Sequence, residues 1–575
     1  MCGNPPWDKI KVEDKKWFEK QGRMDIVNAG SAAIRKKLVA SLPVSDPELY
    51  ERYKQALDDA ESMSRFVRFS GRFPLTATGD IDLYPLFAEL CLSFSKDAWG
   101  LVLPTGIAIN DSNKAFFGKL IDENRLMSLY DFENREGLFD IHRMFKFCLL
   151  TAGKESEKPK DIKGGFYLTK IEHLVDPRRI YTIKSNEFAS LNPNTKTCPI
   201  FRTSKDAELT TKIYRNSTIL VDDIRGNNPW HVQFQRMLDM SNDSSLFRSY
   251  EDMIGAGANL ADGIFELNGE RYVPLYEGKM IWHYNHHFGT WPTDGARPSS
   301  IPEVGTAELK DAHSFIMPWF WVKQSDVDER LIKTNSNDEI VWHWTHNWLF
   351  GYRCIARSVD QRTFVCSLVP DAYGVGHSIT MLYPHSGAVP VTLLQSMMTS
   401  IVFDYAVRQK VGGINMSVFF VKQFPVLRPE SFSENDKNFI IERAFELNFF
   451  NYDLQGWADE IWEEADDELK DAIINRFEEC NGATVSDKAT WKPEPCIYNP
   501  ERRAIAQAEL DAIYAHLYGL NTEDLKYILD PEDVCGDGCI NETFRVLKDR
   551  EIRVLGEYRT KRLVLEAWRR FGFDN

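Results

Sequence analysis

The sequence contains no run of about 18 or more apolar residues, the length that a membrane-spanning helix requires. Its first residues also lack a charged segment followed by an apolar stretch, so we expect neither a membrane span nor a signal peptide. The ten cysteines are scattered and do not form the dense pattern of a disulfide framework. These absences predict a protein of the reducing cytoplasm.

Acidic residues outnumber basic ones, with 85 Asp and Glu against 69 Lys and Arg. The formal net charge is −16, which argues against a protein that coats nucleic acid over its whole surface. The charge is segregated, however, because residues 455–473 form an acidic block whereas residues 351–423 carry an excess of basic side chains. A local basic cleft can still bind DNA. Within this segment, a protein backbone could also approach DNA closely at Gly412-Gly413. The basic residues from which we predict DNA contacts are Arg353, Arg357, Arg362, Arg408 and Lys410.

The pattern of apolar residues in the first third of the chain favours an α/β sheet. Helical periodicity or short apolar strand-like runs mark most of this part. The expected helices lie at 8–70, 82–94 and 114–123, and the expected strands at 99–107, 126–134, 144–153 and 165–171. Because a polar loop separates the last two strands, we interpret them as a β-hairpin. Strands that alternate with helices and end in a hairpin indicate the second half of a doubly wound sheet.

The pattern of apolar and loop-forming residues changes twice after this part of the chain. From about residue 190, short strand-like runs lie among loops, which predicts a mixed α+β domain. Prolines interrupt the chain at 423–431, and the remaining residues, 433–575, show a helical pattern. The predicted domains are 1–185, 190–430 and 431–575.

The segment Asn4-Pro5-Pro6-Trp7 has a specific physical use when it follows a strand. Two prolines fix the backbone and remove two N–H donors, so carbonyl oxygens project in a fixed direction. The Asn4 side-chain oxygen and a prolyl carbonyl can then accept hydrogen bonds from one planar amino group, while Trp7 stacks on the ring that carries it. Such a site makes the lone pair of an exocyclic amine available. A rigid turn without catalytic function is the alternative reading of these residues taken alone.

Together with later motifs, this turn resembles the catalytic motif of the gamma-type N6-adenine DNA methyltransferases, especially the large enzymes of bacterial restriction–modification and phage-defence systems. The resemblance covers essentially the whole chain and depends on an ordered series of segments. These segments are GDIDLYPLF (79–87), GLVLPTGI (100–107), HRMFKFCLLT (142–151), FRTSKDAEL (201–209), PLYEGKMI (274–281), RCIARSVDQRTF (353–364), FDYAVRQKVGGINMS (403–417) and ELDAIYAHLYGL (509–520).

The resemblance implies transfer of a methyl group from S-adenosylmethionine to N6 of an adenine flipped out of double-stranded DNA. It implies a catalytic domain at 1–185, a target-recognition domain at 190–430 and the family's helical end at 431–575. The catalytic residues would be Asn4, Pro5, Pro6 and Trp7. The strand HRMFKFCLLT looks like the motif whose aromatic ring faces the target base, which makes Phe147 and Phe145 the candidate stacking residues.

The chain departs from this family in its cofactor motif. The family builds its S-adenosylmethionine pocket from a glycine-containing loop and an acidic residue that both precede the catalytic motif, and only Met1, Cys2 and Gly3 precede Asn4. We therefore expect the main cofactor-binding motif to lie outside this chain. A separate N-terminal methyltransferase half, a misassigned start and a disrupted gene would each explain this, and other defence-system subunits are further candidate partners.

Two other functions stay open. One is a catalytically silent module that recognises DNA for a partner enzyme. The other is a protein or RNA methyltransferase, although such enzymes usually end soon after the catalytic domain. The segment HYNHH (283–287) has no acidic or cysteine neighbour at metal-ligand spacing, so we predict a solvated or DNA-facing loop and no metal site. We find no nuclease pattern of the Asp…(Asp/Glu)-x-Lys type, so any cleavage activity would lie elsewhere.

Overall fold

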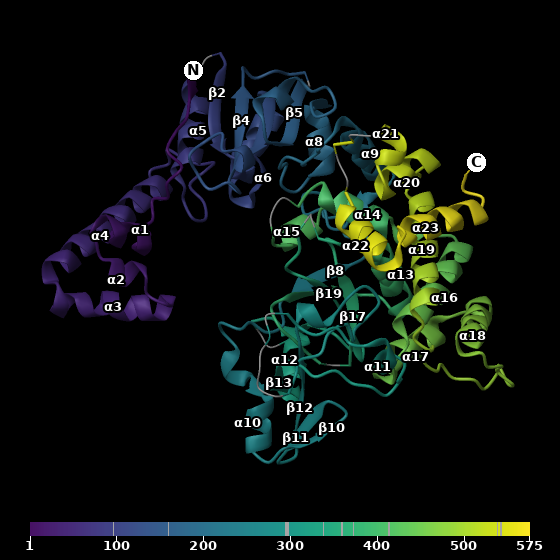
Figure 1. Ribbon diagram of the computed structural model, residues 1–575. Helices are drawn as coiled ribbons and strands as arrows, with labels where there is room; N and C mark the ends of the chain where they lie inside the picture. Colours follow the sequence, from purple (N-terminus) through teal and green to yellow (C-terminus); the bar gives the residue numbers. More distant parts are fainter. Residues whose placement is uncertain are drawn as a thin grey trace. The chain divides into compact units, whose positions relative to one another are not determined.

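The computed structural model places the chain in two compact units, Met1–Ala207 and Glu208–Asn575. The residues that it describes are 1–95, 97–158, 160–293, 298, 300–336, 339–357, 360–371, 373–411, 414–536, 539–540 and 543–574. Each unit contains its own sheets and helices (Figure 1). Together their elements make a mixed α/β protein with several sheets.

A six-stranded sheet with the order β1-β2-β4-β3-β5-β6 forms the centre of the first unit. Its strands are β1 (Cys2–Gly3), β2 (Trp99–Pro104), β3 (Leu126–Glu133), β4 (Lys146–Ala152), β5 (Asp161–Leu168) and β6 (Tyr181–Lys184). β1 and β2 are parallel, as are β3 and β5, whereas β4 runs antiparallel to both β2 and β3. The four strands β1, β2, β3 and β5 therefore all point in one direction and end at the same edge of the sheet.

The predicted strands at 99–107, 126–134 and 144–153 are confirmed, but the predicted hairpin is wrong. β4 and β5 are not neighbours, because β3 lies between them. β4 finds its antiparallel partners in β2 and β3 and takes an interior position, which suits a strand with apolar residues on both faces. The chain then crosses to the far side of β3, and β5 runs parallel to it.

Helices account for most of the remaining residues of the first unit. The predicted helical stretch at 8–70 contains α1 to α4, and the helices predicted at 82–94 and 114–123 are α5 and α7. The bounds are α1 (Asp14–Lys20), α2 (Met24–Val27), α3 (Ala32–Ser45), α4 (Pro47–Phe69), α5 (Leu83–Phe94), α6 (Gly106–Ile109), α7 (Lys114–Asp122) and α8 (Ser185–Leu191). Asp46 begins α4 by accepting the N–H of Leu49, with Pro47 in the first turn, and α1 to α4 share a small core of their own around Phe18 and Tyr53.

The second unit begins as short strands and loops. Two larger sheets have the orders β10-β11-β12-β13-β9, with β18 beside β12, and β17-β16-β19-β8; two further strand pairs are β14-β15 and β20-β7. The strands are β7 (Thr218–Ile219), β8 (Val232–Gln235), β9 (Arg248–Ser249), β10 (Asn259–Ala261), β11 (Ile264–Leu267), β12 (Glu270–Tyr276), β13 (Phe320–Lys323), β14 (Ile332–Thr334), β15 (Ile340–His343), β16 (Trp348–Arg353), β17 (Cys366–Pro370), β18 (Gly374–Val375), β19 (Ile379–Pro384) and β20 (Pro425–Val426).

The end of the chain is helical, as its sequence pattern predicts. The helices from α9 onward are α9 (Ser204–Arg215), α10 (Tyr250–Gly255), α11 (Thr306–Leu309), α12 (Gln324–Arg330), α13 (Ala388–Thr399), α14 (Ile401–Arg408), α15 (Val418–Val421), α16 (Glu434–Asn448), α17 (Gln455–Glu464), α18 (Asp467–Asn481), α19 (Pro500–Leu517), α20 (Thr522–Leu529), α21 (Glu532–Cys535), α22 (Arg545–Leu555) and α23 (Arg559–Arg570). One hydrophobic core joins the strands of this unit to these helices, from Leu209 through Leu349 and Met397 to Trp568. The division between 190–430 and 431–575 stays a prediction about function, because one core serves both parts.

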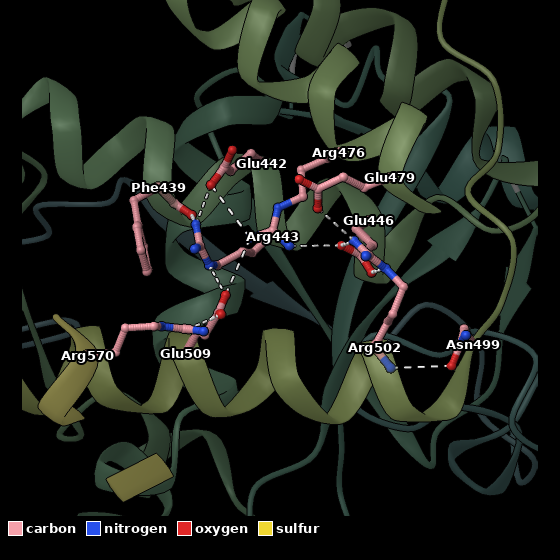
Figure 2. A network of polar contacts seen from close by, with 10 residues as sticks. All are labelled: Phe439, Glu442, Arg443, Glu446, Arg476, Glu479, Asn499, Arg502, Glu509 and Arg570. Carbon is pink, nitrogen blue, oxygen red and sulfur yellow. Dashed lines mark hydrogen bonds and ion pairs between the residues drawn. The ribbon is translucent and has the colours of Figure 1, made fainter. Parts of the chain in front are cut away.

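A network of ion pairs links four helices of this unit (Figure 2). Arg443 on α16 donates to the Glu509 carboxylate on α19 at 2.5 Å, and Arg476 on α18 donates to Glu446 at 3.1 Å and to Glu509 at 3.3 Å. Arg502 reaches Glu446 at 3.1 Å, and Arg570 of α23 pairs with Glu509. Because the buried carboxylates each meet more than one guanidinium group, the network compensates for their desolvation.

We expect this network to give the protein an acid-sensitive component of stability. Burial alone would raise the pKa of Glu509, but the charge and hydrogen bonds of Arg443 and the charges of Arg476 and Arg570 hold that pKa below its ordinary value. Its stabilising contribution is therefore complete above the unfolded-state pKa of about 4.3 and is lost as the pH falls through the lower folded-state pKa.

The test is urea unfolding of the wild type and of Glu509→Gln at pH 7, 5 and 4. The difference in unfolding free energy between the two proteins should be constant from pH 7 to 5 and should shrink below that. Groups distant from Glu509 titrate alike in both proteins and cancel in this difference. A difference that grows on acidification would contradict the assignment.

Candidate active site

The opening turn lies at the edge of the sheet where the parallel strands end. Asn4 directly follows β1, Thr105 follows β2, and Lys146 begins the antiparallel strand β4 at the same edge, opposite Glu133 of β3. In open α/β sheets, ligands bind outside the carboxyl ends of the strands. The fold therefore places the sequence-predicted catalytic residues where ligand chemistry is expected.

A cavity of about 310 Å³ is formed by Asn4, Pro5, Pro6 and Trp7 together with Phe139 and Ile141. Its volume is within the range of small-molecule sites. The side chains of Asn4 and Pro6 are exposed and the Trp7 ring is half-buried. The turn thus presents one amide group, two rigid carbonyl groups and an aromatic ring to a single space.

Both predicted stacking residues contact Trp7. The centroid of the Trp7 ring lies 5.8 Å from that of Phe145, with the planes 13° apart, and 6.4 Å from that of Phe147. Phe147 is 3% exposed and its ring stacks on Phe132 at 5.3 Å, whereas Phe145 is 43% exposed. Trp7 and Phe145 therefore form a direct aromatic pair. Of the two phenylalanines, Phe145 has the ring accessible to a base.

A buried carboxyl group organises the same edge of the sheet. Asp131 of β3 accepts a hydrogen bond from the Thr105 hydroxyl group and another, at 3.2 Å, from the backbone N–H of Tyr167. Burial raises the pKa of Asp131, although the charge of Lys146 acts against this. Tyr167 has a φ of 57°, a left-handed conformation, at an irregularity in the pairing of β3 with β5. These contacts fix the ends of β2, β3 and β5 relative to each other.

Two cations lie on the ring of Tyr167, and the sequence interpretation missed them. The Arg202 guanidinium carbon is 3.7 Å and the Lys146 Nζ 4.2 Å from the centroid of that ring. Lys146 also pairs with Glu133 at 3.3 Å, but no carboxylate in the described part of the chain pairs with Arg202. Arg179, which is half-buried, adds a third positive charge close to Arg202. The residues stand far apart in the sequence, so only folding reveals this basic cluster.

The five basic residues predicted to bind DNA occupy different environments in the second unit. Arg357 is exposed and pairs with Asp360 at 2.7 Å. Arg353 packs on the rings of Trp282 and Phe288 and donates to the carbonyl of Ile281. The Arg357 side chain is 62% exposed, whereas those of Arg362 and Arg408 are 13% and 4% exposed.

The remaining members of this set point inward. Arg362 and Arg408 both pair with the buried carboxylate of Asp404, at 3.2 and 3.3 Å. Lys410 is 3% exposed, donates to the carbonyl of Gln423 at 2.6 Å and lies over the ring of Tyr214. This placement gives Arg408 and Lys410 structural partners and does not favour direct DNA contact. Gly412 and Gly413 lie outside the described residues.

The prediction that HYNHH (283–287) is a solvated loop is wrong. His283, His286 and His287 are at most 5% exposed and belong to the interior of the second unit. The loop is buried because elements distant in the sequence cover it, Phe450 among them, which stacks on His286 at 4.7 Å. Its acidic partner, Asp453, also comes from far along the chain.

The residues at this edge offer hydrogen-bond acceptors and an aromatic ring to a ligand that carries an amino group. Asn4 and the prolyl carbonyls can hold an amino group, but the strands of the described sheet are followed by no glycine-rich loop that would enclose S-adenosylmethionine. We assign no residue of this chain to the cofactor. Among the described residues, no helix is long and apolar enough to span a membrane.

Comparison with known proteins gives only weak likenesses. No protein-family profile matches the sequence, and no curated protein matches it. Among solved structures, the chain is similar to the type IIG restriction endonuclease BpuSI, with 13% identity and a TM-score of 0.25 over 72% of this chain and 52% of that one. It is also similar to the type IIL restriction-modification enzyme MmeI in complex with DNA, with 12% identity and a TM-score of 0.34 over 80% of this chain and 55% of that one. The chain thus spans about half the length of each. Similarity at this level carries no conclusion about function.

Proposed function

We propose that the protein is a site-specific DNA methyltransferase that acts on N6 of a flipped adenine, within a restriction–modification or phage-defence system. The observation that carries this proposal is the Asn4-Pro5-Pro6-Trp7 turn at the carboxyl edge of the sheet, beside a cavity and an exposed aromatic ring. The ordered resemblance to gamma-type adenine methyltransferases supports the same assignment.

The chemistry of the chain's own residues concerns the acceptor amine. The Asn4 side-chain oxygen and the Pro5 carbonyl accept the two N6 hydrogens of adenine, which draws the nitrogen toward tetrahedral geometry and frees its lone pair. S-adenosylmethionine, when bound, supplies the methyl group. Extruding the base costs a few kcal/mol. Stacking on Trp7 returns about 1–3 kcal/mol, so the aromatic ring offsets much of that cost.

Double-stranded DNA is the partner that this chemistry requires, and residues 190–430 are proposed to read its sequence. Near the base cavity, the basic cluster of Lys146, Arg202 and Arg179 is suited to the phosphates that flank the flipped nucleotide. Arg357 is a further phosphate contact in the second unit.

Arg202→Gln should weaken DNA binding without changing its sequence preference. A phosphate contact contributes equally on all sequences, so DNA affinity should fall several-fold on specific and random duplexes alike. The slope of the logarithm of the binding constant against the logarithm of the salt concentration should decrease in magnitude by about one. The measurement is fluorescence anisotropy at several salt concentrations. Arg65→Gln, which removes an exposed arginine of α4, is the matched control. Unchanged affinity and slope for Arg202→Gln would remove Arg202 from the DNA interface.

A catalytically silent DNA-recognition module is the second candidate, favoured by the direct contact between Trp7 and Phe145. Long-read sequencing of DNA from cells with the native locus, without it and with its Asn4→Ala variant separates the two. An active methyltransferase produces N6-methyladenine at one sequence motif, which disappears when the locus is deleted. Deletion would also remove a mark made by a partner that this chain guides, so Asn4→Ala at the native locus is the deciding variant. The mark disappears in Asn4→Ala if this chain is the catalyst and persists if the chain is a silent module.

A further inference from the structure

Two histidines and an aspartate meet inside the second unit, away from the candidate active site. The Nε2 atoms of His286 and His287 lie 2.8 and 2.6 Å from the two carboxylate oxygens of Asp453. Both histidine side chains are 1% exposed and that of Asp453 is 18% exposed. One ligand atom from each of the three residues falls within 4.8 Å of the others. Asp453 belongs to a 3-10 turn, Tyr452–Leu454, so the cluster joins the strand-rich part of this unit to its helical part.

The cluster forms one wall of a cavity of about 310 Å³. His287 and Asp453 line it together with Asp262, Asp371 and other residues, so three carboxylates face one space. The negative charge of Asp453, after burial, helps to raise the pKa of Asp371. The cavity is therefore arranged to attract a cation.

Hydrogen bonds among His286, His287 and Asp453 account for only some of the polar atoms of these three side chains. Each histidine can donate one N–H to Asp453, but the Nδ1 atom of His287 is buried and has no hydrogen-bond partner among the described residues. Buried polar atoms are nearly always paired.

We propose that His286, His287 and Asp453 bind a divalent transition-metal ion of the zinc class. Two imidazole nitrogens and one carboxylate are donors typical of Zn²⁺, whereas Mg²⁺ and Ca²⁺ prefer oxygen alone. Metal–ligand bonds of about 2.0–2.1 Å require the nitrogen and oxygen atoms to move apart by roughly half an ångström from their present contacts. Three protein ligands leave a coordination position open, and because His287 and Asp453 line the cavity, that position faces it.

The experiment uses the full chain, stripped with EDTA and titrated with ZnCl₂ by calorimetry, with metal content measured after dialysis. We expect one zinc ion per chain and at least a tenfold loss of affinity in His287→Gln and in Asp453→Asn. His346→Gln is the matched control, because His346 also pairs with a carboxylate, Glu460 at 2.8 Å, but lies outside the cluster. Its zinc affinity should equal that of the wild type.

Two further readouts keep the result decisive if a variant folds poorly. Zinc should raise the melting temperature of the wild type by mass action, and bound Co²⁺ should give the intense visible absorption of a four-coordinate site. Three results would overturn the proposal: no stoichiometric uptake by the wild type, equal uptake by the wild type, His287→Gln and Asp453→Asn, or a Co²⁺ spectrum without those bands. Equal uptake would mean an adventitious ion only.

Discussion

Asn4→Ala is expected to abolish adenine methylation while leaving DNA binding almost unchanged. The Asn4 oxygen accepts from the reacting amine and gains strength as that amine becomes tetrahedral, so its loss acts on the transition state. Removing one such positioned group costs other enzymes about 100-fold to 1000-fold in rate. We therefore expect at least about a 100-fold fall in methylation rate. The measurement is N6-methyladenine sequencing of DNA from cells that carry the variant at the native locus.

DNA affinity supplies the necessary second readout. Asn4 meets no phosphate in the proposed complex, so the affinity of Asn4→Ala for duplex DNA should stay within about threefold of the wild type. Asn28→Ala, which changes an exposed asparagine elsewhere in the first unit, should retain both activities. Loss of DNA binding in parallel with methylation would assign Asn4 to binding or folding instead of catalysis.

Asp404→Ala should destabilise the second unit strongly, lowering the free energy of unfolding by about 3–5 kcal/mol. Asp404 is fully buried and accepts the backbone N–H groups of Thr363 and Phe364 at 2.9 and 2.7 Å. Asp404 also pairs with Arg362 and Arg408. Its removal therefore leaves two guanidinium groups in the interior without the carboxylate that offsets their positive charge. Chemical denaturation at pH 7 measures the effect.

Two controls identify the cause. Asp404→Asn keeps an acceptor for the backbone N–H groups but removes the charge, so it should destabilise less than alanine does. Asp549→Ala removes an exposed carboxylate from α22 and should change stability by no more than about 0.5 kcal/mol. A loss for Asp404→Ala as small as that of Asp549→Ala would show that the arginines do not depend on this partner.

The local elements of the first unit could be predicted because their patterns are local. WGLVLP and LMSLYDFE are short apolar runs bounded by turn residues, and they form β2 and β3. The order of strands in a sheet is not local, however. β4 is interior because β2 and β3 pair with its two edges, and β5 pairs with the other edge of β3. The polar loop between β4 and β5 mimics a hairpin.

The candidate site, like the fold, could be predicted only where its residues form one continuous stretch of sequence. Asn4-Pro5-Pro6-Trp7 is a continuous motif, so its chemistry can be read directly from the sequence. The roles of Arg408 and Lys410 could not be predicted, because a basic residue that pairs with a buried aspartate or carbonyl has the same spacing as one that contacts DNA. Asp453 lies so far from His287 in the sequence that no spacing rule joins them.

The short ladder between β7 and β20 has a consequence for how this protein can vary. Thr218 and Ile219 pair with Val426 and Pro425, so the two ends of the segment 220–424 lie side by side. A segment with adjoining ends can be exchanged as a cassette. Within this segment, however, α13 and α14 pack against α16, α17, α19 and α20. Its inner face must still complement the shared core, so a transplanted cassette should bring its buried partners along.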